Sequence, residues 1–600
     1  MTSAPLHDPH HDGSALYVLD APDELGGEAT VRLRVPRERA AGAVALRYLH
    51  DGEPRGVQAE VDCETETDTW WRATFPVLTP DTRYRWLVTG GDFGYAWVNG
   101  GGVVPADVPD ADDFVLSPDR GGPDWHLSSV VYEIFPDRFA SSGLGVEPPS
   151  WALRRAWDEL PTGRGPATPC EWFGGDLRGI EQRLDHVERL GANAIYMTPV
   201  FPAGSTHRYD ASSFDTVDPL LGGDEALAAL ARAASGRGIR LVGDLTTNHC
   251  GERHPWFQAA LAAPDAPERS FFYFDDALPN GYECWLGVPS LPKLDWRSPE
   301  LRERMTAIVG RRLGALDGWR IDVAHMTGRY RDLDLNHEVA RLLRAAGGDA
   351  LLVAEHGHDY RDDLRSGGWH GAMNYAGFLR PAWTWLRGDD LPEDLRSEFW
   401  GVPAGLPRLD GVQAATTMRA FRAGVPWQAV LHSWPLLDSH DTARFRTVAG
   451  SRERHVVGIG LQMTTPGVPM VFAGDELGLE GAWGEDARRT MPWGRPESWD
   501  TGLLEAYRRL IALRRSEDAL ARGGIRYVFV GAETIAYLRE TPHDRLLCLA
   551  SRSTHAPVRL PLGALGCSAL ETLYGGDATI AAGAAVLPAG GPAFHVWRLA

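Results

Sequence analysis

The sequence predicts an α/β protein: a closed (β/α)8 TIM barrel with a β-sandwich before it and another after it. Between residues 130 and 476, eight short apolar segments alternate with amphipathic stretches, as parallel strands alternate with helices. Both ends of the chain show strand-like alternation instead. The 600 residues also exceed what one hydrophobic core organises. We therefore expect three domains, at residues 1–126, 127–522 and 523–600.

The first domain is predicted from four segments of alternating apolar and polar residues separated by turn residues. These segments are residues 29–36, 43–50, 70–77 and 83–90. A stretch rich in Gly, Pro and Asp follows at residues 101–114, and we expect it to be a linker.

The barrel strands are predicted from apolar runs that end in polar residues. They are residues 130–139, 192–200, 238–249, 317–326, 350–357, 371–377, 432–441 and 467–476. The gap after the third run is too long for one helix, so we expect a small inserted subdomain at about residues 250–290. Strand-like pieces at residues 525–531, 534–540, 546–552 and 593–600 predict the C-terminal β-sandwich.

Charge and composition narrow the class of protein. The formal charge of −21 disfavours nucleic acid and anionic membranes as partners and suits a neutral ligand such as a sugar. No apolar run reaches the roughly 18 residues of a spanning helix, and the N-terminus has no signal-peptide pattern. Six scattered cysteines without a C-x-x-C pair indicate free thiols. We expect a cytoplasmic protein.

The chemistry is predicted at the C-terminal ends of the barrel strands, where such folds place their active sites. Arg320 and Asp322 are two residues apart on a strand, so their side chains point the same way. Glu355 ends the next strand, and Asp441 brings a third carboxylate. An ionised Asp322 beside Arg320 and a protonated Glu355 are the groups that a retaining glycosidase uses. A structural ion-pair network is the alternative.

The motifs then match a known family. DLTTNH (244–249), GWRIDVAH (318–325), VAEH (353–356), LDSHD (437–441) and GVPMVFAGDE (467–476) occur in the order of glycoside hydrolase family 13, the α-amylase family. FGGDLRGI (173–180) and HRYDASSFDTVDP (207–219) extend the resemblance, which covers residues 125 to 600.

The resemblance implies a role for each matched residue. Asp322 would be the nucleophile, Glu355 the general acid/base, and Asp441 the residue that grips the sugar hydroxyls. Arg320 would orient the nucleophile. Two histidines would hydrogen-bond the sugar and one tyrosine would stack on it: these are His249, His440 and Tyr209.

The stretch SLPKLDWRS (290–298) contains Lys293, the single lysine of the chain. Its PKL motif and YEIFPDRFA (132–140) resemble the neopullulanase, cyclomaltodextrinase and maltodextrin glucosidase branch of the family. His325 and Met326 depart from the V-A-N-E pattern of neopullulanases, and we expect both to contact substrate at the mouth. For Lys293 our hypothesis is that a compact ammonium fits a packed loop where a guanidinium would not. The alternative is a remnant of a composition biased against lysine.

No cofactor and no essential metal are expected. Relatives bind calcium through a loop that here reads ASSGLGVEPPS (140–150), and of the accompanying ligands only Gly174 and Asp176 remain. Asn248 matches a calcium ligand of the wider family and is expected to brace its loop. Ser439 replaces the asparagine usual before His-Asp.

The expected function is retaining hydrolysis of α-glucosidic bonds in short malto-oligosaccharides, linear or cyclic. Three alternatives remain: a hydrolase of cyclic malto-oligosaccharides or of α-1,6 bonds, a transglycosylase, and a catalytically inactive sugar-binding protein. The partner would be an oligosaccharide. The resemblance also implies a starch-binding-like N-terminal domain and a homodimer formed through it.

Overall fold

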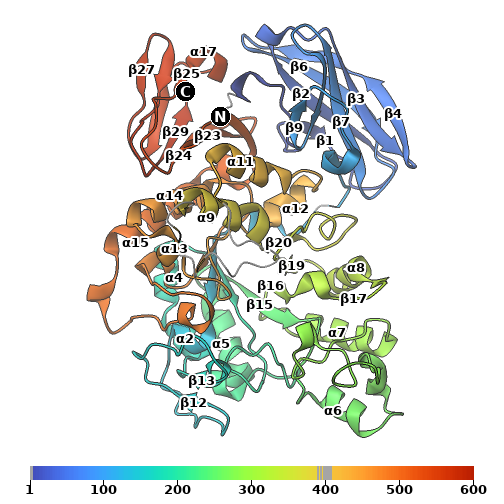
Figure 1. The fold of residues 1–600 in the computed structure, drawn as a ribbon, viewed down its shortest axis with the longest axis vertical. Coiled ribbons are helices and arrows are strands. Elements are labelled where there is room, and N and C mark those ends of the chain that lie inside the picture. Colours follow the sequence, from blue (N-terminus) through green and yellow to red (C-terminus); the bar gives the residue numbers. More distant parts are fainter. Residues whose placement is uncertain (1–4, 120, 388–390, 392–394, 396–407) are drawn as a thin grey trace.

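The computed structural model describes residues 5–119, 121–387, 391, 395 and 408–600. A barrel forms the middle of the molecule (Figure 1). The two antiparallel β units, blue and red, lie above it, and the segments around α6 and β12 lie at the opposite end (Figure 1).

Seven parallel strands form the barrel sheet, in the order β20-β19-β16-β15-β14-β11-β21. They are β11 (Val131–Ile134), β14 (Ala194–Met197), β15 (Arg240–Thr246), β16 (Gly318–Asp322), β19 (Leu351–Ala354), β20 (Gly371–Ala372) and β21 (Met470–Phe472). The ring closes between β20 and β21 through two single parallel bridges, Met373 with Trp434 and Leu436 with Met470. Pro435 lies between the bridged residues and has no N–H to donate, so this eighth member is not a regular strand. The predicted fold class is confirmed.

Helices cover the outside of the ring and join successive strands. They include α3 (Leu177–Gln182), α4 (Leu184–Leu190), α5 (Gly223–Ser235), α7 (Pro299–Arg311), α8 (Asn336–Gly347), α14 (Arg452–Thr464) and α15 (Thr501–Ser516). In α5, the buried residues Ala226, Leu227, Leu230 and Ala234 recur every three to four positions, so one face packs on the sheet. Ser298 begins α7 as an N-cap, accepting from Leu301 N.

The insertion follows β15 and contains α6 (Pro255–Ala262), η6 (Pro267–Phe271) and η7 (Trp285–Gly287). Its aromatic side chains Phe257, Phe271 and Phe272 are buried and join the barrel core. A single antiparallel bridge pairs Lys293 with His249, so the end of the insertion runs back along the mouth of β15.

The N-terminal unit has two antiparallel sheets, β1-β2-β6-β5 and β4-β3-β7-β8-β9, with β10 on β7. Its strands are β1 (Val18–Asp20), β2 (Glu28–Pro36), β3 (Ala43–His50), β4 (Glu53–Gln58), β5 (Glu60–Glu64), β6 (Asp68–Pro76), β7 (Thr82–Gly90), β8 (Gly94–Asn99), β9 (Gly102–Val104) and β10 (Phe114–Leu116).

The linker predicted at residues 101–114 is wrong, because β9, η3 (Asp110–Asp112) and the start of β10 belong to this unit. Phe114 and Leu116 are buried in its core. Of the Gly, Pro and Asp residues that indicated a linker, Gly102 lies in β9 and Asp110 and Asp112 lie in η3.

The C-terminal unit pairs a five-stranded sheet, β22-β23-β24-β29-β26, with a three-stranded one, β25-β28-β27. These strands are β22 (Gly524–Val530), β23 (Thr534–Glu540), β24 (Arg545–Ser551), β25 (Arg559–Pro561), β26 (Leu570–Tyr574), β27 (Thr579–Ala581), β28 (Ala584–Val586) and β29 (Ala593–Leu599). The start of the chain packs here: Leu6 is in its core, and Asp12 Oδ2 accepts from Ile525 N at 2.7 Å.

All six cysteines are free thiols. Across the described ranges, the longest apolar helices still fall short of what a membrane crossing requires.

Candidate active site

A cavity of about 820 Å³ opens at the C-terminal ends of the barrel strands. Seven of the nine residues predicted for catalysis and substrate binding line it: Tyr209, His249, Asp322, His325, Met326, Glu355 and Asp441. The other two, Arg320 and His440, lie fully buried next to the lining residues. The structure therefore brings the whole predicted set together.

Arg320 organises the carboxylates at the floor of this cavity. Its Nη1 lies 3.0 Å from Asp322 Oδ1 and 2.9 Å from Asp244 Oδ2. Its Nη2 lies 3.0 Å from Glu355 Oε2. Arg320 and Asp322 share a face because they are two residues apart on β16. One guanidinium thus joins the ends of β15, β16 and β19.

The protonation of this group differs from the simple expectation that Arg320 ionises Asp322 alone. Burial and the neighbouring Glu355 raise the pKa of Asp322 well above its usual range, against the effect of Arg320. The pKa of Glu355 is raised as well. Burial is the largest cause, Arg320 opposes it, and the charge of Asp441 adds to the increase. Because the two carboxyls are buried close to other carboxyls, the pair holds a proton to a higher pH than isolated carboxyls do, even though Arg320 opposes this.

The atoms of the pair differ in what they contact. Glu355 Oε2 accepts from Val323 N at 2.7 Å. Among the described residues, Asp322 Oδ2 is buried without a hydrogen-bond partner, 3.8 Å from His249 Nε2. Val323 has φ 45°, a strained conformation for a β-branched residue, and it directs its N–H to Glu355. One oxygen of Asp322 therefore remains available for chemistry.

Two basic side chains, His440 and Arg488, hold the carboxylate of Asp441. His440 Nε2 and Arg488 Nη2 each lie 3.1 Å from its carboxylate. Burial raises the pKa of Asp441, but these cations outweigh it, and the net shift is downward. His440 is buried, which lowers its pKa, yet Asp441 and Glu133 together raise it above the usual value. The surroundings thus favour the ionised form of Asp441, beside a histidine whose pKa is raised.

Tyr209 completes this side of the site. Its hydroxyl lies 2.7 Å from His440 Nε2 and donates to Asp244 Oδ2 at 2.9 Å. The Tyr209 and His440 rings stack with centroids 5.6 Å apart and an interplanar angle of 9°. The hydroxyl contacts fix the Tyr209 ring as one wall of the cavity.

His325 and Met326 lie in η8 (Ala324–Met326), which follows β16. The ring of His325 contacts the ring of His358, which lies on the loop after β19. Burial, together with neighbouring histidines, lowers the pKa of His325 to about 3. Both predicted residues therefore belong to the cavity wall, and His325 is a neutral imidazole near pH 7.

Several cavity residues were missed by sequence reasoning: Arg488, Trp285, Leu286, His207 and His358. Arg488 also donates to His440 O at 2.7 Å. It lies in no motif, and no local signal could have singled it out among 59 arginines. Leu286 is 72% exposed with φ 46°, but both features are visible only in the structure, and the sequence shows no more than Trp-Leu-Gly at residues 285–287.

Lys293 is 4% exposed and joins two loops at the side of the cavity. Its Nζ donates to Met326 O at 3.0 Å and to Asn248 Oδ1. Burial lowers the pKa of Lys293 to about 8. The Asn248 oxygen that resembles a calcium ligand is therefore already occupied by an ammonium group.

Asp176, the second residue expected to remain from a calcium site, also forms hydrogen bonds within the protein. Asp176 Oδ1 accepts from Gly179 N at 2.7 Å as the N-cap of α3, and Oδ2 accepts from Ser142 N at 2.8 Å. Both oxygens of this carboxylate thus have protein partners.

A TIM barrel with Asp322 and Glu355 on one guanidinium, and Asp441 beside an arginine and a histidine, has the arrangement of a glycoside hydrolase. A family model described as "Alpha amylase, catalytic domain" matches residues 133–357. The chain belongs to the α-amylase family, glycoside hydrolase family 13.

Relatives in this family were found by sequence and by structure. Neopullulanase 2 from Thermoactinomyces vulgaris is 33% identical over 416 residues, 67% of this chain and 65% of the relative. A cyclomaltodextrinase from Geobacillus thermopakistaniensis is 32% identical over 466 residues, 74% of this chain and 72% of the relative. The solved cyclic α-maltosyl-(1→6)-maltose hydrolase from Arthrobacter globiformis has a TM-score of 0.66 and 29% identity, covering 80% of this chain and 100% of that one.

Proposed function

We propose that the chain hydrolyses α-glucosidic bonds of short malto-oligosaccharides, linear or cyclic, by a retaining double displacement. The observation that carries the proposal is the placing of Asp322 and Glu355 on one guanidinium inside a sugar-sized cavity. Relatives named neopullulanase and cyclomaltodextrinase support α-glucans as the substrate class.

In the first step, the unpartnered Asp322 Oδ2 attacks the anomeric carbon. The glycosidic C–O bond breaks, and Glu355 gives its proton to the leaving oxygen. In the second step, Glu355 takes a proton from water, the water oxygen attacks the same carbon, and the bond to Asp322 breaks. Before the first step the pair of carboxyls holds one proton, so one carboxyl is charged and the other is protonated.

The remaining residues bind and orient the sugar. An ionised Asp441 accepts hydrogen bonds from sugar hydroxyls, supported by Arg488 and His440. Tyr209 offers a ring face for stacking, and His249 a hydrogen-bonding nitrogen. Arg320 holds Asp322 in position.

The experiment is a product profile on maltotriose, β-cyclodextrin, pullulan and a cyclic α-1,4/α-1,6 tetrasaccharide. The first product should carry the α configuration when followed by NMR, because two inversions restore the original anomer. A β-anomer as first product would contradict the double displacement. Products longer than maltotriose would identify transglycosylation as a main activity.

A second candidate is hydrolysis of cyclic substrates containing α-1,6 bonds. It is favoured by the structural likeness to the Arthrobacter globiformis hydrolase, which spans all of that chain. The cyclic tetrasaccharide in the same profile tests it. An inactive sugar-binding protein is disfavoured, because all three carboxyls lie in the cavity.

We propose further that the protein is a cytoplasmic homodimer, with the starch-binding-like N-terminal sandwich at the interface. An intracellular maltogenic amylase of Bacillus subtilis, 29% identical over 67% of this chain, supports the location. We propose that hydrolysis needs no calcium or other cofactor, since Lys293 and Ser142 engage the oxygens of Asn248 and Asp176. Neither nucleic acid nor a membrane is proposed as a partner. Sedimentation at micromolar concentration tests the dimer.

A further inference from the structure

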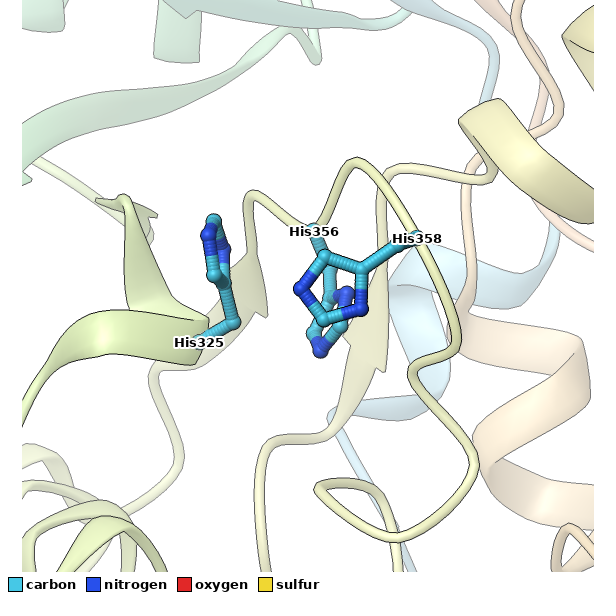
Figure 2. Close-up of side chains that lie close together, drawn as sticks. All are labelled: His325, His356 and His358. Carbon is cyan, nitrogen blue, oxygen red and sulfur yellow. The ribbon is translucent and has the colours of Figure 1, made fainter. Parts of the chain in front are cut away.

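Three histidines form a cluster on one side of the cavity. His325 comes from η8, and His356 and His358 come from the loop after β19. One ring nitrogen of each lies within 4.8 Å of those of the other two. Figure 2 shows His325 rising from one segment and His356 and His358 together on the neighbouring loop. His325 and His358 also line the cavity.

Asp363, itself bound by Arg329, fixes the orientation of the His356 ring. Its Nε2 lies 3.0 Å from Asp363 Oδ2, and Arg329 donates to both oxygens of Asp363, at 2.8 and 2.6 Å. A carboxylate kept ionised by an arginine accepts, so Nε2 carries the hydrogen and Nδ1 keeps its lone pair. A carboxylate behind a histidine is the arrangement that orients metal-binding imidazoles.

Two of the other ring nitrogens in the cluster have no hydrogen-bond partner in the part of the chain that the structure describes. His356 is fully buried, and its Nδ1 has no hydrogen-bond partner among the described residues. His325 Nδ1 is likewise buried and unpartnered there. Leaving such an atom unsatisfied costs about 1–3 kcal/mol, so two in one cluster indicate that something else binds them.

We propose that His325, His356 and His358 form a binding site for a divalent transition metal of the zinc class. Three imidazoles with a fourth position open to a cavity are a common zinc ligand set, whereas calcium and magnesium require oxygen ligands. Tetrahedral ligation at about 2.0–2.1 Å places nitrogens about 3.3 Å apart. The nitrogens lie within 4.8 Å of one another without an ion, so binding requires the side chains to move closer, and His358 is the exposed one of the three.

A cation bound there occupies the cavity that also holds Asp322 and Glu355. Zinc therefore inhibits by blocking the oligosaccharide, a consequence that rests on the proposed function. Metal binding itself does not rest on it. The competing role for the free nitrogens is hydrogen bonding to sugar hydroxyls, which requires no metal affinity.

The test uses the full chain without an affinity tag, stripped of metal by a chelator and then dialysed. Titration with Co²⁺ should give visible absorption bands of a four-coordinate ion, saturating at one equivalent per chain and abolished by Zn²⁺. His358→Gln should weaken Co²⁺ and Zn²⁺ binding by at least about tenfold, as loss of a ligand does. His543→Gln, which changes an exposed histidine outside the cluster, should leave binding unchanged.

Asp363→Asn is the second variant, because it keeps all three histidines and removes the negative charge behind His356. It should weaken binding by about 10- to 100-fold. No stoichiometric metal in the parent, or equal affinity in His358→Gln and the parent, overturns the site. Metal binding without inhibition of maltotriose hydrolysis overturns the blocking role. Absence of hydrolysis in the parent, both metal-free and after calcium is added back, overturns the proposed function and leaves the site supported by binding.

Discussion

Lys293 Nζ donates a hydrogen bond to the carbonyl oxygen of Met326 at 3.0 Å. This contact joins the end of the insertion to the turn that follows Asp322. The same ammonium donates to Asn248 Oδ1. One buried cation therefore holds together the loops after β15 and β16, which supports the hypothesis that a compact ammonium is needed there.

Lys293→Arg should lower both the thermal midpoint and kcat, because a planar guanidinium does not fit between these two oxygens. Lys293→Met keeps the bulk but leaves both oxygens without a donor, at about 1–3 kcal/mol for each buried group. Differential scanning fluorimetry and maltotriose kinetics measure the two effects. If Lys293→Arg matches the parent in both, the hypothesis is wrong.

Calcium removal should leave the parent unchanged. The ammonium of Lys293 and the N–H groups around Asp176 already engage the oxygens that a calcium ion would need. Activity and thermal midpoint are compared after dialysis with and without EDTA, then with added calcium. Activity lost in EDTA and regained with calcium would contradict this prediction.

Asp322→Asn should reduce kcat by about 10³-fold or more, since an amide cannot act as the nucleophile. Glu355→Gln should be comparably impaired on natural substrates but less so on aryl glucosides, whose leaving groups need no proton. The matched control is Asp359→Asn, an exposed aspartate on the same loop. An Asp322→Asn enzyme as fast as the parent would remove the basis of the mechanism.

Arg488→Gln should raise KM more than it lowers kcat for maltotriose. The substitution removes a cation 3.1 Å from Asp441, so the carboxylate binds sugar hydroxyls in a less fixed position. Arg489→Gln is the matched control, because Arg489 is the next residue and pairs with Asp486. Steady-state kinetics of the two variants decide the matter, and equal KM values would refute a role for Arg488.

The fold and the grouping of the candidate catalytic carboxyls were predictable from the sequence because their signals are local. Apolar runs ending in Asp322 or Glu355 mark strands whose C-terminal ends meet at one mouth. The irregular member was visible as an apolar run, and Pro435 within it, which has no N–H to donate, was a local sign of incomplete strand pairing.

Other features depend on contacts between segments far apart in the chain, and no local pattern carries them. Arg488 binds Asp441, which lies 47 residues earlier in the chain. The ring of His356, on the loop after β19, contacts the ring of His325, which lies in η8. The raised pKa of Asp322 was missed for the same reason. A sequence shows Arg320 beside Asp322, but only the structure shows the same guanidinium against Glu355.

Acid should destabilise the protein through its buried histidines. Burial lowers the pKa of His455 to about 3 and of His249 to about 3. Unfolded histidines bind a proton below about pH 6.5, whereas these folded ones do not until about pH 3. The unfolded state thus holds more protons in this window, and stability falls as the pH decreases through it, by at most about 1.4 kcal/mol per pH unit for each histidine.

The measurement is the urea midpoint at pH 7, 6 and 5 for the parent and for His455→Phe. His455 is fully buried and its Nε2 lies 3.1 Å from Tyr507 OH, so the variant starts from a lower stability. The comparison is therefore of slopes, and the variant should lose less stability per pH unit because one titrating group is gone. His543→Gln serves as the exposed control and should keep the parent's slope. A His455→Phe slope equal to the parent's would show that this histidine is already protonated in the folded protein at pH 5.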